Sequence, residues 1–313
     1  MSNHEQIPDT ATASPLLVLD QLKKHYPVHG GILNRVTGHV KAVDGVDLTI
    51  YPGETLGLVG ESGCGKSTLG RCIVGLEQPT DGRILFAGDN IAGRSTKDMV
   101  QLRTKLQIVF QDPYSSLHPR KTVGDQIAEP LYVHRIVPRQ EVQKEVDRLL
   151  ETVGLPSTSK SRYPHEFSGG QRQRIGIARA LALKPQLIVC DEPVSALDVS
   201  IQAQVLNLLK ELQKELGLTY LFIAHGLGAV RYISDRIAVM NAGKIVEIGD
   251  TKELLRSPKH PYTKVLLDAF PVPDPRRRNR ERIELTDEVL DSVNPANPMN
   301  SADQTNPTNP TNL

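Results

Sequence analysis

The 313-residue chain contains no tryptophan, and aromatic residues make up only 4% of it. No apolar run approaches the roughly 18 residues that a helix needs to cross a bilayer, and the mean hydropathy is −0.29. The N-terminal segment, Met1 to Ser14, is polar and lacks the basic-then-apolar order of a secretion signal. We therefore expect one or two domains, no secretion signal and no membrane-spanning helix.

Cysteine is scarce as well: Cys64, Cys72 and Cys190 lie far apart or inside predicted regular elements. Such a scattered set argues against a disulfide framework or a metal cage, and it is typical of reduced thiols in a cytosolic protein. The formal net charge of +1 argues against broad nucleic-acid binding.

Glycine, by contrast, is concentrated in one loop. A short apolar strand predicted at 55–59 leads into Gly60-Glu61-Ser62-Gly63-Cys64-Gly65-Lys66-Ser67, which fits the pattern Gly-x-x-x-x-Gly-Lys-[Ser/Thr]. Its glycines let backbone N–H groups curl around phosphates, and Lys66 reaches the β- and γ-phosphates. The Ser67 hydroxyl can ligate Mg²⁺, and a helix that starts near Lys66 and includes Thr68 would point its positive end at the anion. The loop predicts nucleotide binding but names no reaction.

Strands and helices alternate along much of the chain. Apolar alternation and short apolar runs predict strands, whereas apolar residues three and four apart predict helices. The predicted strands are 16–19, 46–50, 55–59, 84–87, 106–110, 187–190, 220–224, 237–240 and 244–248. The predicted helices lie mainly within 122–163, and at 168–181 and 199–216. This order predicts an α/β fold with a mainly parallel sheet.

Further polar groups follow predicted strands or open a predicted helix. They are Gln111, Asp191, Glu192, His225 and the segment Ser168-Gly169-Gly170-Gln171. Each has an ordinary interpretation when taken alone: a polar loop, a histidine used for packing, or a glycine-rich helix entry. Together they fall at the carboxyl ends of parallel strands or in adjoining loops, where open α/β sheets bind ligands.

Taken together, these motifs resemble those of the nucleotide-binding subunits of ABC transporters. The resemblance runs from about Leu17 to Arg282. The resemblance rests on six segments in the family's order. These are Walker A at 60–67, the Q-loop residue Gln111, the signature Phe167-Ser168-Gly169-Gly170-Gln171, Walker B at 187–191 followed by Glu192, the D-loop Ser195-Ala196-Leu197-Asp198 and the switch residue His225.

Within that family the chain is most similar to the ATP-binding subunits of dipeptide and oligopeptide importers. The matching stretches are 111–120, 128–131 and Ser257-Pro258-Lys259-His260-Pro261-Tyr262-Thr263.

The resemblance implies an α/β fold of the P-loop NTPase class: a RecA-like core with an ABC helical subdomain, an antiparallel β segment and a C-terminal extension. The expected ranges are 15–256 for the ATPase domain, about 112–167 for the helical subdomain and 257–293 for the extension. We expect disorder in 1–14 and in 294–313, where Asn, Pro and Thr dominate and too little apolar surface is present to offset the ordering entropy.

The resemblance also implies roles for the residues that act on ATP within one subunit. Lys66 and Ser67 would bind phosphate and Mg²⁺, and Asp191 would hold the metal through water. Glu192 would be the general base. His225 would hold the γ-phosphate and the attacking water in register, and Gln111 would link Mg²⁺ and the γ-phosphate to the helical subdomain.

Two such subunits would dimerise head to tail around two ATP molecules. Ser168 and Gly170, with their neighbours in the signature, would complete the partner's site, and Asp198 of the D-loop would also lie at the nucleotide. Tyr26 is the candidate for stacking on adenine, although Pro27 to His39 separate it from the P-loop by more residues than is usual.

Two departures from the family pattern affect these expectations. The residue after the switch histidine is usually Asp, but here it is Gly226, with Gly228 close by, so His225 would be less firmly oriented. No cysteine follows Cys190, so no iron–sulfur cluster is expected as a cofactor beside ATP and Mg²⁺.

The partners implied are two transmembrane permease subunits, a second ABC ATPase (a paralogue or a second copy) and, indirectly, an extracytoplasmic solute-binding protein, with no nucleic acid. The implied location is the cytoplasmic face of the cell membrane, as a peripheral subunit. The transported solute stays open between dipeptides, oligopeptides, nickel and another small solute. A soluble ABC ATPase that acts as an ATP-dependent clamp is the alternative from another class.

Overall fold

The structure is a computed structural model that describes residues 14–30 and 35–269. The segments expected to be disordered, 1–14 and 294–313, lie outside the described residues except for Ser14. Most of the C-terminal extension expected at 257–293 also lies outside them.

A six-stranded sheet forms the centre of the molecule, in the order β10-β9-β3-β8-β7-β6. Its parallel strands are β3 (Thr55–Val59), β6 (Leu106–Val109), β7 (Leu187–Asp191), β8 (Thr219–Ile223) and β9 (Arg236–Asn241). Strand β10 (Lys244–Asp250) pairs antiparallel with β9. All residues of β3, β7 and β8 are buried, which explains why these strands read as continuous apolar runs. The predicted α/β fold with a mainly parallel sheet is confirmed.

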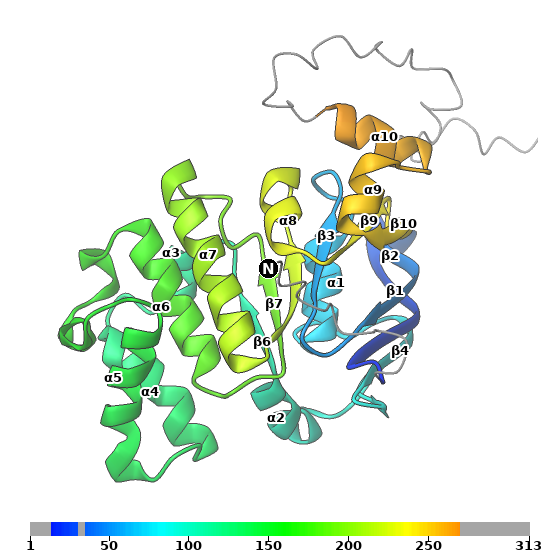
Figure 1. Cartoon of the computed structure of the whole chain (residues 1–313). Helices are drawn as coiled ribbons and strands as arrows, with labels where there is room; N and C mark the ends of the chain where they lie inside the picture. The colour runs from blue at the N-terminus through cyan, green and yellow to red at the C-terminus, as the bar shows by residue number, and fades with distance from the viewer. Residues whose placement is uncertain (1–13, 31–34, 270–313) are drawn as a thin grey trace, which may run out of the picture.

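Hydrophobic cores lie on both faces of this sheet. One face packs against α1 (Lys66–Ile73) and a second sheet; the other packs against α6 (Gly169–Leu181), α7 (Val199–Leu216) and α8 (Leu227–Ile233). Figure 1 shows α6 and α7 on one side of the sheet and α1 on the other. Helix α2 (Thr96–Lys105), which precedes β6, was not among the predicted helices.

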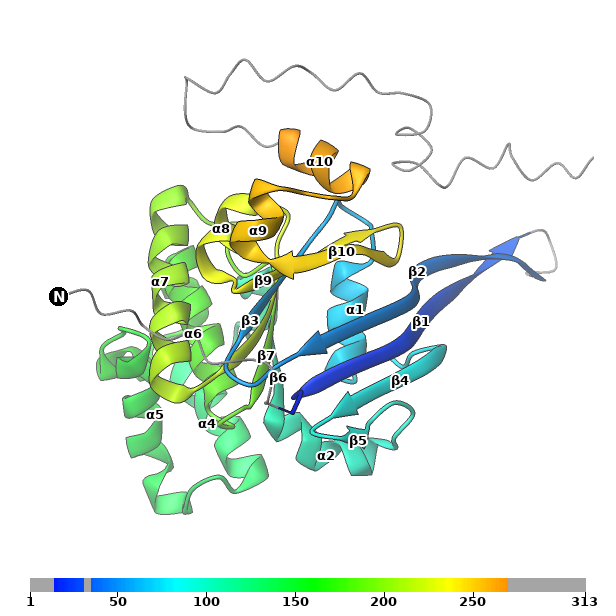
Figure 2. The same ribbon diagram turned by 45° about the vertical axis from the view of Figure 1, so that its right-hand side comes forward.

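The second sheet is antiparallel, in the order β2-β1-β4-β5. Its strands are β1 (Leu17–Gly30), β2 (Arg35–Ile50), β4 (Asp81–Phe86) and β5 (Asp89–Asn90). The β1–β2 pair extends well beyond the predicted strands 16–19 and 46–50 and projects from the body of the molecule (Figure 2). The projecting part is largely exposed, including Val28, Val36 and Val40, and the glycine and polar residues between these valines weaken its strand pattern.

A group of helices lies between β6 and α6 in the sequence. It contains α3 (Pro113–Ser116), α4 (Val123–His134), α5 (Val142–Thr152) and single 3₁₀ turns at 139–141, 157–161 and 164–166. The helical face predicted within 122–163 is buried, because its apolar residues are at most 1% exposed: Val142, Val146, Leu149, Leu150 and Val153.

Two further helices follow the β9–β10 hairpin, α9 (Thr251–Arg256) and α10 (Pro261–Asp268). Leu254 of α9, and Tyr262 and Leu266 of α10, belong to the same core as α7 and α8. No helix in the described ranges is long and apolar enough to cross a membrane.

Candidate nucleotide-binding site

The predicted P-loop connects β3 to α1 and is pressed against two strands. A Cβ atom on Gly65 would lie 1.9 Å from the carbonyl oxygen of Ala42, and one on Gly60 would lie 2.1 Å from that of Met240. Gly65 also has a φ of 109°, which disfavours a side chain. Glycine is therefore required at both positions by close backbone contact as well as by loop conformation.

The loop holds its own lysine. Lys66 is 3% exposed, and its Nζ donates to the carbonyl oxygens of Gly60 at 2.8 Å and Glu61 at 2.7 Å. Gly65 is the N-cap of α1, and no side chain caps this helix end. A helix N-terminus without a side-chain cap leaves backbone N–H groups for an anion, so the loop fits a phosphate.

An oxygen pair suited to a hard cation lies beside the loop. Ser67 Oγ donates to Asp191 Oδ1 at 2.8 Å, and Asp191 is the last residue of β7 and 4% exposed. The described residues contain no cluster of three or more His, Cys, Asp or Glu side chains positioned for a metal. A hydroxyl with one carboxylate is the small protein contribution that Mg²⁺ takes when nucleotide phosphates supply other ligands.

Glu192 lies at the centre of the remaining polar groups. Gln111 Nε2 donates to its Oε2 at 2.7 Å, and His225 Nε2 contacts its Oε1. The three residues follow β6, β7 and β8, which are neighbours in the sheet, and this explains how they meet. Glu192 is 4% exposed and has a φ of 50°, and its N–H donates to the carbonyl of Ile223 at 3.0 Å. Such left-handed backbone at a non-glycine residue is typical of active sites.

The structure brings Tyr26 closer to the P-loop than the sequence separation indicates. Residues 27–30 and 35–39 belong to the projecting β1–β2 hairpin, so Tyr26 pairs directly with Val40. The Tyr26 hydroxyl bonds to Glu77. Burial and then this bond raise the pKa of Tyr26, which also bonds to Thr68 of α1.

The signature segment lies apart from the P-loop within one chain, because α6 and α1 pack on opposite faces of the sheet. Ser168 caps α6: its Oγ accepts from the N–H of Gln171 at 3.3 Å, and Gln171 Oε1 accepts from the N–H of Ser168 at 3.0 Å. A Cβ atom on Gly170 would lie 2.3 Å from Cγ2 of Ile201. The second signature glycine is therefore also required for packing against α7.

The D-loop connects Glu192 to that packing contact. Asp198 is the N-cap residue of α7, and its side chain makes no capping bond. Leu197, the residue before it, lies under Gly169, because a Cβ on this glycine would be 3.3 Å from Cδ2 of Leu197. The D-loop and the signature thus form one packed unit.

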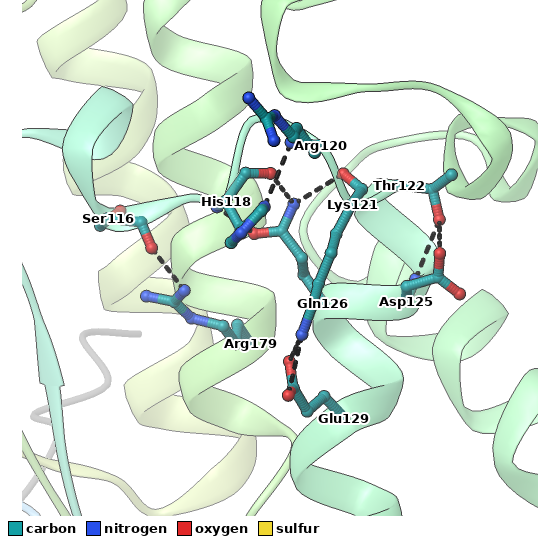
Figure 3. Close-up of polar contacts among 9 residues, drawn as sticks. All are labelled: Ser116, His118, Arg120, Lys121, Thr122, Asp125, Gln126, Glu129 and Arg179. Carbon is teal, nitrogen blue, oxygen red and sulfur yellow. Dashed lines mark hydrogen bonds and ion pairs between the residues drawn. The ribbon is translucent and has the colours of Figure 1, made fainter.

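The segment after Gln111 is held by the helical group and by α6 (Figure 3). Arg179 of α6 donates through Nη1 to the carbonyl of Ser116 at 2.6 Å. The buried amide of Gln126 accepts from the N–H of His118 at 2.7 Å and donates to the carbonyl of Lys121 at 3.0 Å. The signature helix and the segment after the Q-loop are therefore directly joined.

One contact was not foreseen. The Tyr262 hydroxyl of α10 accepts from the N–H of Glu61 in the P-loop at 3.1 Å. The sequence around Tyr262 indicates only a similarity to peptide importers, and no sequence pattern pairs it with a loop 201 residues earlier.

Two family models match the chain. Residues 43–195 match the one described as ABC transporter, and residues 246–295 match the one described as Oligopeptide/dipeptide transporter, C-terminal region. The oligopeptide transport ATP-binding protein OppF of Bacillus subtilis is 59% identical, over 85% of this chain and 86% of the relative. OppF of Salmonella typhimurium is 51% identical, over 90% of this chain and 85% of the relative.

Solved structures agree with these matches. The cbiO1 protein of Clostridium perfringens, part of the ABC transporter complex cbiONQ, has a TM-score of 0.68 and 31% identity, over 78% of this chain and 91% of that one. The ATP-binding cassette MJ0796, in a dimeric post-hydrolysis state with ADP and Pi, has a TM-score of 0.67 and 28% identity, over 75% and 98% of the two chains. The chain therefore belongs to the ATP-binding proteins of the ABC transporter family, in the oligopeptide transport group, and is an ATPase.

Proposed function

We propose that this chain is the subunit that hydrolyses ATP to energise the import of oligopeptides through a membrane transporter. The observation that supports the hydrolytic site best is the buried Glu192 carboxylate, which is contacted by both Gln111 and His225 beside the P-loop. The oligopeptide transport proteins among its relatives, at up to 59% identity, support the class of solute.

In this proposal the P-loop binds the phosphates through backbone N–H groups, and Lys66, held at the carbonyls of Gly60 and Glu61, reaches the β- and γ-phosphates. Glu192 accepts the proton of the attacking water. His225 holds that water and the γ-phosphate in line. Gln111 couples nucleotide binding at this site to the helical group. Tyr26 stacks on the adenine.

Ser67 and Asp191 fit Mg²⁺ through their hydroxyl and carboxylate oxygens, Asp191 acting through water and Gln111 as a third contact. When bound, Mg²⁺ would neutralise the charge that develops on the phosphates. No other cofactor is proposed beside ATP and Mg²⁺, and an iron–sulfur cluster is not expected.

The signature segment 168–171 and Asp198 act in a head-to-tail dimer, where they complete the partner subunit's ATP site. The separation of α6 from α1 on opposite faces of the sheet supports this arrangement, because one chain alone does not bring the two segments together. ATP binds the closed dimer more tightly than the open one, so hydrolysis shifts the population toward the open state.

The partners in this proposal are two transmembrane permease subunits and a second ABC ATPase, either a paralogue or another copy of this chain. An extracytoplasmic solute-binding protein acts indirectly, and no nucleic acid takes part. The chain is then a peripheral subunit at the cytoplasmic face of the cell membrane.

Purification from native membranes tests the proposal. We expect two multi-span subunits and a second ATPase to co-purify, and the complex in vesicles to take up oligopeptides only with ATP. A complex that carries Glu192→Gln serves as the inactive control. Recovery of only soluble partners or nucleic acid would support the clamp alternative, and uptake of nickel in place of peptides would correct the solute.

A further inference from the structure

Helix α10 lies next to the P-loop although it belongs to the C-terminal region. Its Tyr262 side chain is 0% exposed and packs in the core with Leu254 and Leu266. The Tyr262 hydroxyl is placed at the P-loop, where it accepts from the N–H of Glu61 at 3.1 Å. Packing therefore fixes the Tyr262 ring, and the hydroxyl at the tip of the ring makes a specific polar contact with the P-loop.

The start of α10 is anchored to the central sheet. The Glu247 carboxylate of β10 accepts from the N–H of Lys259 at 2.8 Å and from that of His260 at 3.0 Å. Nδ1 of His260 then accepts from the N–H of Tyr262 at 3.1 Å. These bonds set the position of the helix that carries Tyr262, independently of the P-loop.

The same peptide unit of the P-loop is held on its other side by Lys66. The peptide between Gly60 and Glu61 is trans, so its N–H and its carbonyl point in opposite directions. The N–H donates to Tyr262 Oη, while the carbonyl of Gly60 accepts from Lys66 Nζ at 2.8 Å. The orientation of this peptide therefore links the Tyr262 hydroxyl to the position of the Lys66 ammonium.

We infer that Tyr262 is a positioning residue of the ATP site, through which the C-terminal region orients the Gly60–Glu61 peptide and thereby Lys66. The inference rests on the proposed role of residues 60–67 in binding ATP. Loss of the hydroxyl leaves the peptide free to turn, so Lys66 spends less time where the β- and γ-phosphates bind. Burial raises the pKa of Tyr262 from its ordinary value of 10.0 to about 12.

The full-length variants Tyr262→Phe and Tyr220→Phe test the inference. Both remove one buried tyrosine hydroxyl, but within the described part of the chain that of Tyr220 has no hydrogen-bond partner. Loss of one neutral hydrogen bond predicts that Tyr262→Phe raises the Kd and KM for ATP about three- to tenfold, with kcat nearly unchanged. Tyr220→Phe leaves both constants at the wild-type value.

Amide hydrogen exchange at Glu61 is a second measurement, and its rate would not change if Tyr262 served only to pack the core. We expect the amide of Glu61 to exchange faster in Tyr262→Phe than in Tyr220→Phe, when each variant is measured at the same interval below its own melting temperature. Equal ATP affinity and equal Glu61 exchange in the two variants would overturn the inference and leave the ATP site in place. Failure of the wild-type protein to bind ATP would instead overturn the site itself.

Discussion

The hydroxyl oxygen of Ser67 lies 2.8 Å from Oδ1 of Asp191, which joins the first turn of α1 to the end of β7. The two residues are far apart in sequence, and each comes from a separate motif. Their contact shows that the P-loop and the strand that ends in Asp191 form one site. Both oxygens suit Mg²⁺, and this contact is the starting point for the first prediction.

Asp191→Asn is expected to raise the Mg²⁺ concentration needed for half-maximal ATPase activity by about tenfold or more, the scale of losing one group that holds a metal through water. Titration of Mg²⁺ at fixed ATP measures this. Asp20→Asn, which removes the carboxylate that pairs with the exposed Arg83, is the control. Equal Mg²⁺ requirements in the two variants would remove Asp191 from the metal site.

Lys66→Met is expected to weaken ATP binding by about 1.5–3 kcal/mol, because it removes a charged donor to the phosphates. It also removes the bonds to the carbonyls of Gly60 and Glu61, so the loop itself becomes less ordered. Equilibrium binding of ATP measures the loss. Lys210→Met, at a half-buried position of α7 where Lys210 Nζ donates to the carbonyl of Tyr232, should bind ATP like the wild type.

Gly228→Ala is expected to increase the free energy of unfolding by about 0.5–1 kcal/mol, because Ala favours a helix over Gly. Gly228 lies in the first turn of α8, and a Cβ there meets no atom within 4 Å. Gly170→Ala is the contrasting variant, since its Cβ would press on Ile201 and should lower stability. Urea unfolding measures both, and a loss of stability in Gly228→Ala would contradict the account of α8.

Burial raises the pKa of the Cys72 thiol to about 12, with Glu77 adding to the effect. The folded protein therefore keeps this proton more tightly than the unfolded chain, whose thiol has the ordinary value of 9.0. The resulting stability is fully present below pH 9 and is lost as the pH rises toward 12. The free energy of unfolding should fall between pH 8 and 10 in the wild type. In Cys72→Ala this fall should be smaller by about 1 kcal/mol. An identical fall in both proteins would contradict the assignment.

The sequence predicted the elements whose pattern is set by local chemistry. The P-loop was predicted from its glycine pattern. Strand β7 was predicted because a strand buried on both faces has a continuous apolar sequence. The sequence placed Gln111, Glu192 and His225 at the carboxyl ends of parallel strands, and the structure adds that these strands are neighbours in the sheet.

What the sequence did not predict depends on contacts between distant segments. The length of the β1–β2 hairpin is set by strand pairing, because its exposed residues belong to no hydrophobic core that would mark them in the sequence. The contact of Tyr262 with Glu61 exists only once α10 has packed in the core. The fit of Gly170 against Ile201 is likewise a property of the assembled structure, since either residue alone suggests nothing about the other.

The central claim is that Glu192 is the base of an ATP-hydrolysing site, and the variant Glu192→Gln tests it most directly. Steady-state phosphate release and ATP affinity should be measured together on the purified wild type and variant. We predict ATP affinity close to the wild type and turnover lower by about 10²-fold or more, the usual scale for a positioned base. Turnover near the wild-type rate would contradict the account.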